Sequence, residues 1–114
     1  MYDGTYIAPD DDQEALKWYL KAVEAGYQGA ATRLAYLYDE IYDADHSARY
    51  YLEALTKDNE YLIQDLKHFS SFTIVAVKKK LRERGLFKGR ITDAFDRKTE
   101  KALQKYVQLQ VKSQ

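Results

Sequence analysis

Apolar residues three and four positions apart form the main pattern of this chain, and that spacing is typical of amphipathic helices. In the clearest case, Ile74, Val77 and Leu81 share one helical face. Basic residues should form the exterior of that helix: Lys78, Lys79, Lys80, Arg82 and Arg84. Gly85 should end the helix, because glycine accepts the positive φ of a helix C-terminus. Asp96 should cap the next helix, since a carboxylate accepts bonds from free amide groups.

The segment between these two helices carries apolar residues of its own. Phe87, Ile91 and Phe95 recur at four-residue spacing around Gly89. Loops that contain such residues can pack on their own side chains. We therefore expect a packed loop between Gly85 and the second helix.

The first half of the chain should hold four more helices, and two of its blocks are similar. The expected helices are one from the acidic run Asp10, Asp11, Asp12 to Gly26, one over residues 28–38, one capped by Asp45 or Ser47, and one over residues 59–69. Residues 18–23 align with residues 50–55, each an aromatic residue followed by tyrosine and leucine. A repeated helix pair indicates a stacked helical repeat.

This half resembles Sel1-like repeats, relatives of the tetratricopeptide repeat. The residues that carry the resemblance are Ala15, Trp18, Tyr19, Lys21, Ala22, Glu24, Gly26, Ala30, Leu34 and Tyr38, with residues 1–4 as the remnant of a preceding repeat. The resemblance implies a protein partner, with Tyr27, Tyr36 and Tyr50 as candidate contacts. The alternative for the tyrosines is core packing. Because the chain opens within a repeat, we expect it to be the C-terminal part of a longer protein.

The last third resembles the peptidoglycan-binding-like domain, a small helical module of bacterial cell-wall proteins. The matching residues are Ile74, Val77, Leu81, Gly85, Leu86, Phe87, Gly89, Ile91, Phe95, Thr99, Ala102, Leu103 and Tyr106. The chain departs from the family at Lys78, usually glutamine, at Thr92 and Asp93, usually Asp-Gly, and at Asp96, usually glycine. The framework therefore matches the family better than the loop does.

The resemblance implies that the loop supplies contacts to peptidoglycan. Phe87 would stack on a sugar, Lys88 and Arg90 would pair with stem-peptide carboxylates, and Thr92 and Asp93 would bind amides or hydroxyls. The alternative is that the Phe87 ring belongs to the core and that the charged side chains are only solvated. A second alternative is that the module has lost glycan binding and serves as a structural cap or a protein-binding surface.

Charge divides the chain into two halves although its formal net charge is zero. Residues 1–71 carry a net charge of −8 and residues 72–114 a net charge of +8. This asymmetry supports a boundary near Ser70 and Ser71, with domains at 1–69 and 70–114. The two halves could attract each other, or the basic half could bind an anionic partner. Nucleic acid is a minor alternative, because the second helix has no set of base-reading side chains on one face.

The sequence offers little catalytic chemistry. Cysteine is absent, which excludes disulfides and thiolate sites. His46 and His68 are the only histidines, and neither has a nucleophile or ligand set beside it in the sequence. The run of aspartates at residues 10–12 lacks the spacing of a calcium loop. We expect no enzyme, no metal site and no cofactor.

Taken together, we expect an all-α chain in which helical repeats pack directly on a small peptidoglycan-binding-like module. The pairing resembles the C-terminal periplasmic region of bacterial polar localisation factors. It implies a non-enzymatic scaffold in the periplasm of a Gram-negative bacterium, with membrane attachment only through an upstream segment. A targeting region of a larger cell-wall enzyme is the remaining alternative.

Overall fold

The computed structural model describes residues 9–57 and 60–112, and every regular element in them is helical. The elements are α1 (Pro9–Glu24), α2 (Ala30–Glu40), α3 (Ala44–Lys57), the 3₁₀ helix η1 (Glu60–His68), α4 (Ser71–Glu83) and α5 (Arg97–Lys112). The all-α expectation is confirmed. The side chains of Asp10, Asp11 and Asp12, which we expected at the start of the first helix, and the remnant at residues 1–4 lie outside what the structure describes.

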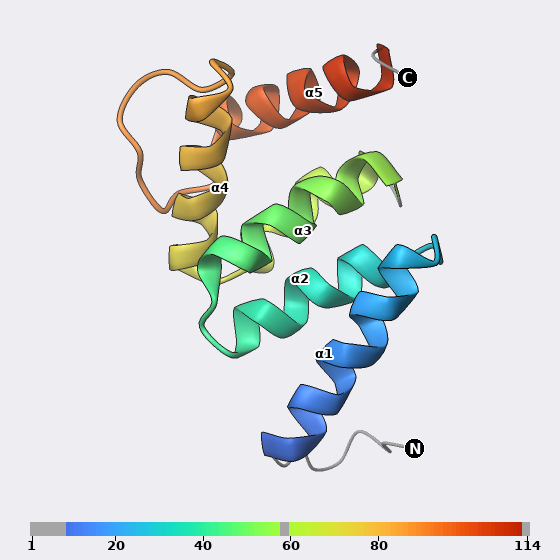
Figure 1. Ribbon diagram of the computed structural model, residues 1–114. Coiled ribbons are helices and arrows are strands. Elements are labelled where there is room, and N and C mark those ends of the chain that lie inside the picture. Colours follow the sequence, from blue (N-terminus) through green and yellow to red (C-terminus); the bar gives the residue numbers. More distant parts are fainter. Residues whose placement is uncertain (1–8, 58–59, 113–114) are drawn as a thin grey trace.

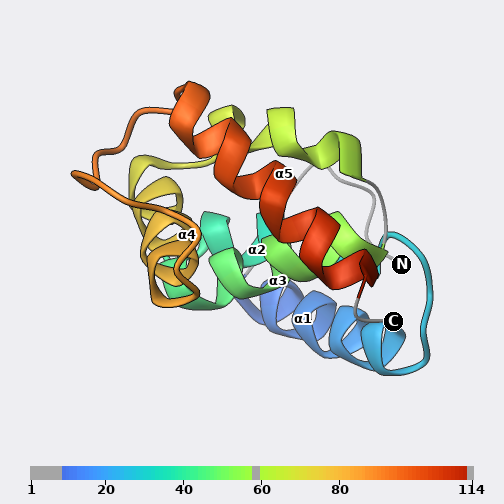
Figure 2. The same cartoon turned by 90° about the horizontal axis from the view of Figure 1, so that it is seen from above.

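The first three helices lie in sequence order, and the last two cover their far side. Figure 1 shows α1, α2 and α3 stacked in alternating directions, with α4 crossing one end of α3 and α5 lying beyond α3. Seen from above in Figure 2, η1 and α5 lie on the side of the molecule opposite α1. As a result α3 is the central helix, packed against α2, η1, α4 and α5.

One hydrophobic core crosses the expected boundary at residue 70. Buried residues from both halves form a single connected cluster, which includes Leu34, Tyr51, Leu55, Leu66, Val77, Leu81 and Leu103. The two segments therefore meet through packed side chains, without an intervening linker. Each segment covers apolar surface of the other, and removing that surface from water stabilises the fold.

Asp39 on α2 joins the two halves by a polar contact at the start of α4. Its carboxylate accepts bonds from the Ser70 hydroxyl at 3.0 Å and the Thr73 hydroxyl at 2.5 Å, as well as from the Ser70 amide at 3.3 Å. Ser70 occupies the N-cap position of α4 but makes no side-chain cap bond. A carboxylate from another helix thus serves the N-terminus of α4.

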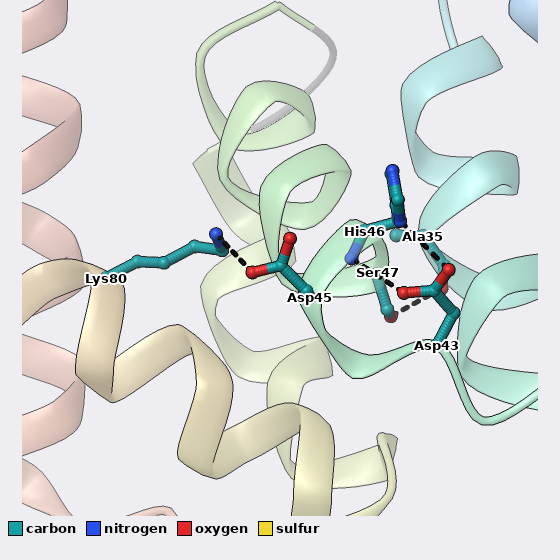
Figure 3. A network of polar contacts seen from close by, with 6 residues as sticks. All are labelled: Ala35, Asp43, Asp45, His46, Ser47 and Lys80. Carbon is teal, nitrogen blue, oxygen red and sulfur yellow. Dashed lines mark hydrogen bonds and ion pairs between the residues drawn. The ribbon is translucent and has the colours of Figure 1, made fainter.

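The cap of α3 also differs from the expectation. Asp43 accepts the His46 amide at 3.2 Å, whereas Asp45 points to α4 and binds Lys80 at 2.9 Å (Figure 3). Ser47 is fully buried and donates to the Ala35 carbonyl at 2.6 Å. The small Ser47 side chain lets α2 and α3 approach closely while its hydroxyl keeps a partner.

The fourth expected helix is a 3₁₀ helix, η1. Its buried residues Ile63 and Leu66, and the buried Phe69 directly after it, recur every three positions, which matches three residues per turn. The Tyr51 hydroxyl donates to the carbonyls of Leu62 and Ile63 at 2.8 and 3.1 Å. Burial raises the pKa of Tyr51 well above its ordinary value. The helix expected over residues 59–69 is thus present as η1, and the spacing of three among the buried residues is the signal of its 3₁₀ type.

A basic loop as the candidate binding site

Lys78 fixes the loop between α4 and α5. Its side chain is fully buried, and its ammonium donates to the Thr92 carbonyl at 2.8 Å and to the Ala94 carbonyl. It also lies 5.7 Å from the centre of the Phe87 ring. Burial lowers the pKa of Lys78, and the carboxylate of Asp96 acts in the opposite direction. The expectation that Lys78 belongs to the helix exterior is therefore wrong, because its charge is used inside the loop.

The loop also has apolar anchors and defined ends. Gly85 has a φ of 74°, and the Leu86 amide donates to the Leu81 carbonyl at 2.9 Å, so the helix stop is confirmed. Phe87 is 4% exposed and belongs to the core. Its ring has no free face for a sugar, and Phe87 drops out of the candidate contacts. Ile91 and Phe95 are partly buried against the same core, as expected of a packed loop.

Asp96 closes the other end of the loop by capping α5. Its carboxylate accepts the Thr99 amide at 3.0 Å and the Thr99 hydroxyl at 2.8 Å. These two bonds lower the pKa of Asp96. The expected cap is confirmed, and it orients the first turn of α5 beside the loop.

Two cationic side chains, from Arg82 and Lys98, reach Gly89 at the loop tip, and two more cationic residues flank it in the chain. The Arg82 guanidinium donates to the Gly89 carbonyl at 2.5 Å, and the Lys98 ammonium lies 3.8 Å from where a Cβ on Gly89 would be. Lys88 and Arg90 flank Gly89 in the chain, and all four cationic side chains belong to exposed residues. We call Arg82, Lys88, Arg90 and Lys98 the Gly89 cluster. Sequence reasoning found Lys88 and Arg90, but it did not place the other two at the loop.

The Gly89 cluster keeps its charges available to a ligand. Within the described part of the chain, no ion pair involves any of its four members. Guanidinium and ammonium groups so placed suit carboxylate or phosphate oxygens. The other expected loop contacts are elsewhere: the Thr92 hydroxyl bonds Lys78 at 3.3 Å, and Asp93 lines a groove beside α4.

The three candidate tyrosines of residues 1–69 differ in exposure. Tyr27 is 71% exposed beside a hollow of about 330 Å³. Tyr50 is 9% exposed and its ring centre lies 5.7 Å from that of Tyr38. Tyr36 stacks on Phe69 with ring centres 4.5 Å apart. Tyr50 and Tyr36 therefore contribute mainly to packing, and Tyr27 remains the accessible candidate.

Two further aromatic residues have exposed side chains. Trp18 and Tyr42 are both largely exposed, and neither was expected from the sequence to be a contact.

His46 bonds Asp43 at 2.9 Å and stacks on Tyr38 (Figure 3). In residues 9–57 and 60–112, no cluster of histidine and acidic residues could hold a metal. None of the described helices is long and apolar enough to cross a membrane.

Comparison with known proteins gives no match to a family model, a curated protein or a solved structure. The resemblances to Sel1-like repeats and to the peptidoglycan-binding-like domain therefore stay predictions.

Proposed function

We propose that the chain is a non-enzymatic scaffold module whose Gly89 cluster binds the carboxylates of peptidoglycan stem peptides. The observation that carries the proposal is that Arg82 and Lys98 reach Gly89, which Lys88 and Arg90 flank in the chain. Arg90 would pair with a carboxylate through two parallel bonds, and Lys88 and Lys98 would add charge.

A fixed loop strengthens this proposal. The buried ammonium of Lys78 and the anchored Phe87 hold the loop before any ligand arrives. Binding then orders few additional residues, and less of the contact energy is lost as conformational entropy. The same argument applies to Arg82, which is already held against the Gly89 carbonyl.

The wider role that we propose follows the sequence resemblances. Residues 1–69 would hold a protein partner near Tyr27, and the Gly89 cluster would contact the cell wall. Together they would connect that partner to the wall in the periplasm of a Gram-negative bacterium.

A second candidate function is favoured by one observation, the burial of Phe87. An aromatic ring would need an exposed face to stack on a sugar, and Phe87 offers none. In this alternative the α4–loop–α5 segment is a structural cap or a protein-binding surface. The two candidates differ in whether the cationic side chains contact cell-wall polymer.

Co-sedimentation with purified peptidoglycan sacculi tests the proposal. At about 0.15 M salt, where the Debye length is about 8 Å, the wild-type chain should pellet with sacculi. The double variant Lys88→Gln/Arg90→Gln should bind about tenfold more weakly or worse, because it loses two charge-assisted contacts. Sacculi whose free carboxyl groups have been amidated should not pellet the wild type.

The matched control is Lys101→Gln/Lys105→Gln. It removes two positive charges from exposed residues of α5 outside the Gly89 cluster. It should pellet like the wild type. Equal pelleting of both double variants, or a wild type that stays in the supernatant, would reject the loop as the wall-binding site and favour the second candidate.

A further inference from the structure

A groove runs along α4, and none of its lining residues belongs to the Gly89 cluster. Its volume is about 580 Å³. One wall is a face of α4, and the others are the first turn of α3 and the loop. The lining residues are Ala44, Asp45, Ser71, Phe72, Val75, Ala76, Lys79, Glu83 and Asp93. The lining positions on α4 run from its first residue to its last, a length of about 20 Å at 1.5 Å per residue.

The floor of the groove is apolar and continues onto the turn after α2. Phe72 is 36% exposed, and Val75 and Ala76 are partly buried beside it. Tyr42 leans on Phe72 with ring centres 5.8 Å apart, and Ile41 next to it is also exposed. Exposed apolar strips of this kind mark contact surfaces more often than isolated exposed residues do.

Tyr42 occupies a backbone position that disfavours its side chain. It follows the C-terminus of α2 with a φ of 65°, and the Asp43 amide bonds the Tyr38 carbonyl at 2.9 Å, which is the closing bond of a helix-ending turn. Glycine or asparagine is preferred at this position. The chain instead holds a tyrosine there whose side chain is 81% exposed. Strain of this kind is common where a side chain is used for contact.

The rim of the groove is acidic, although the surrounding half is basic. The charged lining residues are the carboxylates Asp45, Glu83 and Asp93 and the ammonium of Lys79. Asp45 is already paired with Lys80 at 2.9 Å (Figure 3). Three of these groups are carboxylates, so the rim disfavours polyanions and complements an occupant that carries positive charge.

We propose that the α4 groove binds a basic amphipathic helix of a partner protein. Apolar side chains spaced three and four positions apart along that helix contact Phe72, Val75 and Tyr42. Its lysine or arginine side chains pair with Glu83 and Asp93 at the rim. A helix of about three and a half turns matches the 13 residues of α4. This binding does not depend on the wall-binding function of the Gly89 cluster.

A pair of synthetic peptides tests the groove in solution. The first is a labelled 14-residue helix of leucine and lysine with leucines at positions i, i+3, i+4 and i+7, and the second replaces each lysine with glutamate. Fluorescence anisotropy should show binding of the first peptide at least tenfold tighter than that of the second. Amide resonances of α4 and residues 41–45 should shift in ¹⁵N spectra of the full chain.

Two variants separate loss of the groove from loss of the fold. Tyr42→Gly relieves the positive φ and should raise the melting temperature while weakening the lysine peptide at least tenfold. Glu83→Lys/Asp93→Lys should weaken it similarly. Tyr27→Ala, which removes another exposed tyrosine far from the groove, should leave binding unchanged.

Three results would overturn the proposal. One is equal binding of the lysine and glutamate peptides, and another is unchanged binding by Tyr42→Gly. The third is self-association of the wild type that Tyr42→Gly abolishes, which would assign the groove to a second copy of this chain.

Discussion

The two halves of the chain carry opposite net charges but share one core. Residues 1–71 carry a net charge of −8 and residues 72–114 a net charge of +8, yet buried residues from both form one connected cluster. In the basic half, the side chains of Arg82 and Lys98 reach the loop tip at Gly89, and Lys88 and Arg90 flank it in the chain. A charge division along the sequence therefore describes the surface of the molecule, and it does not locate a boundary in the core.

Truncating a core leucine of α4 should give the largest effect on the shared core. Leu81→Ala should lower the free energy of unfolding by about 2–5 kcal/mol, because Leu81 is fully buried. If one core stabilises both halves, amide exchange should accelerate in α2 and α3 as well as in α4 and α5. The same substitution at Leu109, which is half exposed, should cost below about 1 kcal/mol. Faster exchange confined to α4 and α5 would indicate two separate cores.

Removing the polar link between the halves should have the next largest effect. Asp39→Ala should cost about 2 kcal/mol in urea unfolding, because the Ser70 and Thr73 hydroxyls lose a carboxylate partner. Asp45→Ala is the matched control, since it removes an exposed ion pair with Lys80 and should cost at most about 1 kcal/mol. Equal costs for the two variants would contradict the role assigned to Asp39.

Lys78→Met should loosen the loop without unfolding the protein. The methionine fills the buried space but cannot donate to the Thr92 and Ala94 carbonyls. Amide exchange in residues 86–95 should accelerate about tenfold, which corresponds to a local cost of about 1.4 kcal/mol, while exchange in α3 should stay unchanged. Unchanged exchange in the loop would show that its apolar anchors suffice.

The cap of α5 should produce a smaller, pH-dependent effect. Asp96→Ala should cost about 1 kcal/mol at neutral pH. Because the folded pKa of Asp96 is lower than its ordinary 3.8, its contribution is present above that value and is lost as the pH falls through the folded pKa. The stability difference between wild type and variant should therefore shrink below about pH 4. A difference that stays constant into acid would mean that the Asp96 charge does not matter.

Sequence patterns predicted the parts of this molecule that depend on local chemistry. The helices, the stop at Gly85 and the cap at Asp96 follow from periodicity, glycine and a short carboxylate side chain. The roles of Lys78 and Asp39 depend on partners 14 to 34 residues away, which no local pattern reveals. A lysine among other lysines suggests a solvated exterior, and only the returning loop buries Lys78.

The candidate site was predictable to the same limited extent. Lys88 and Arg90 lie on either side of Gly89 in the sequence, and the resemblance to the family's loop identified them as candidates. Arg82 and Lys98 reach the same point from α4 and from the start of α5, through the geometry of the closed loop. The burial of Phe87 depends on the same closure, because its ring lies under the Lys78 ammonium.

The most direct test of wall binding is a ¹⁵N chemical-shift titration of the full chain with a soluble muropeptide that carries free stem-peptide carboxylates. We expect shifts at Lys88, Gly89 and Arg90 and at the start of α5 near Lys98, and we expect the Lys88→Gln/Arg90→Gln variant to lose them. Shifts that are absent, or that map to α4 groove residues or to Lys101 and Lys105, would contradict the account of the Gly89 cluster.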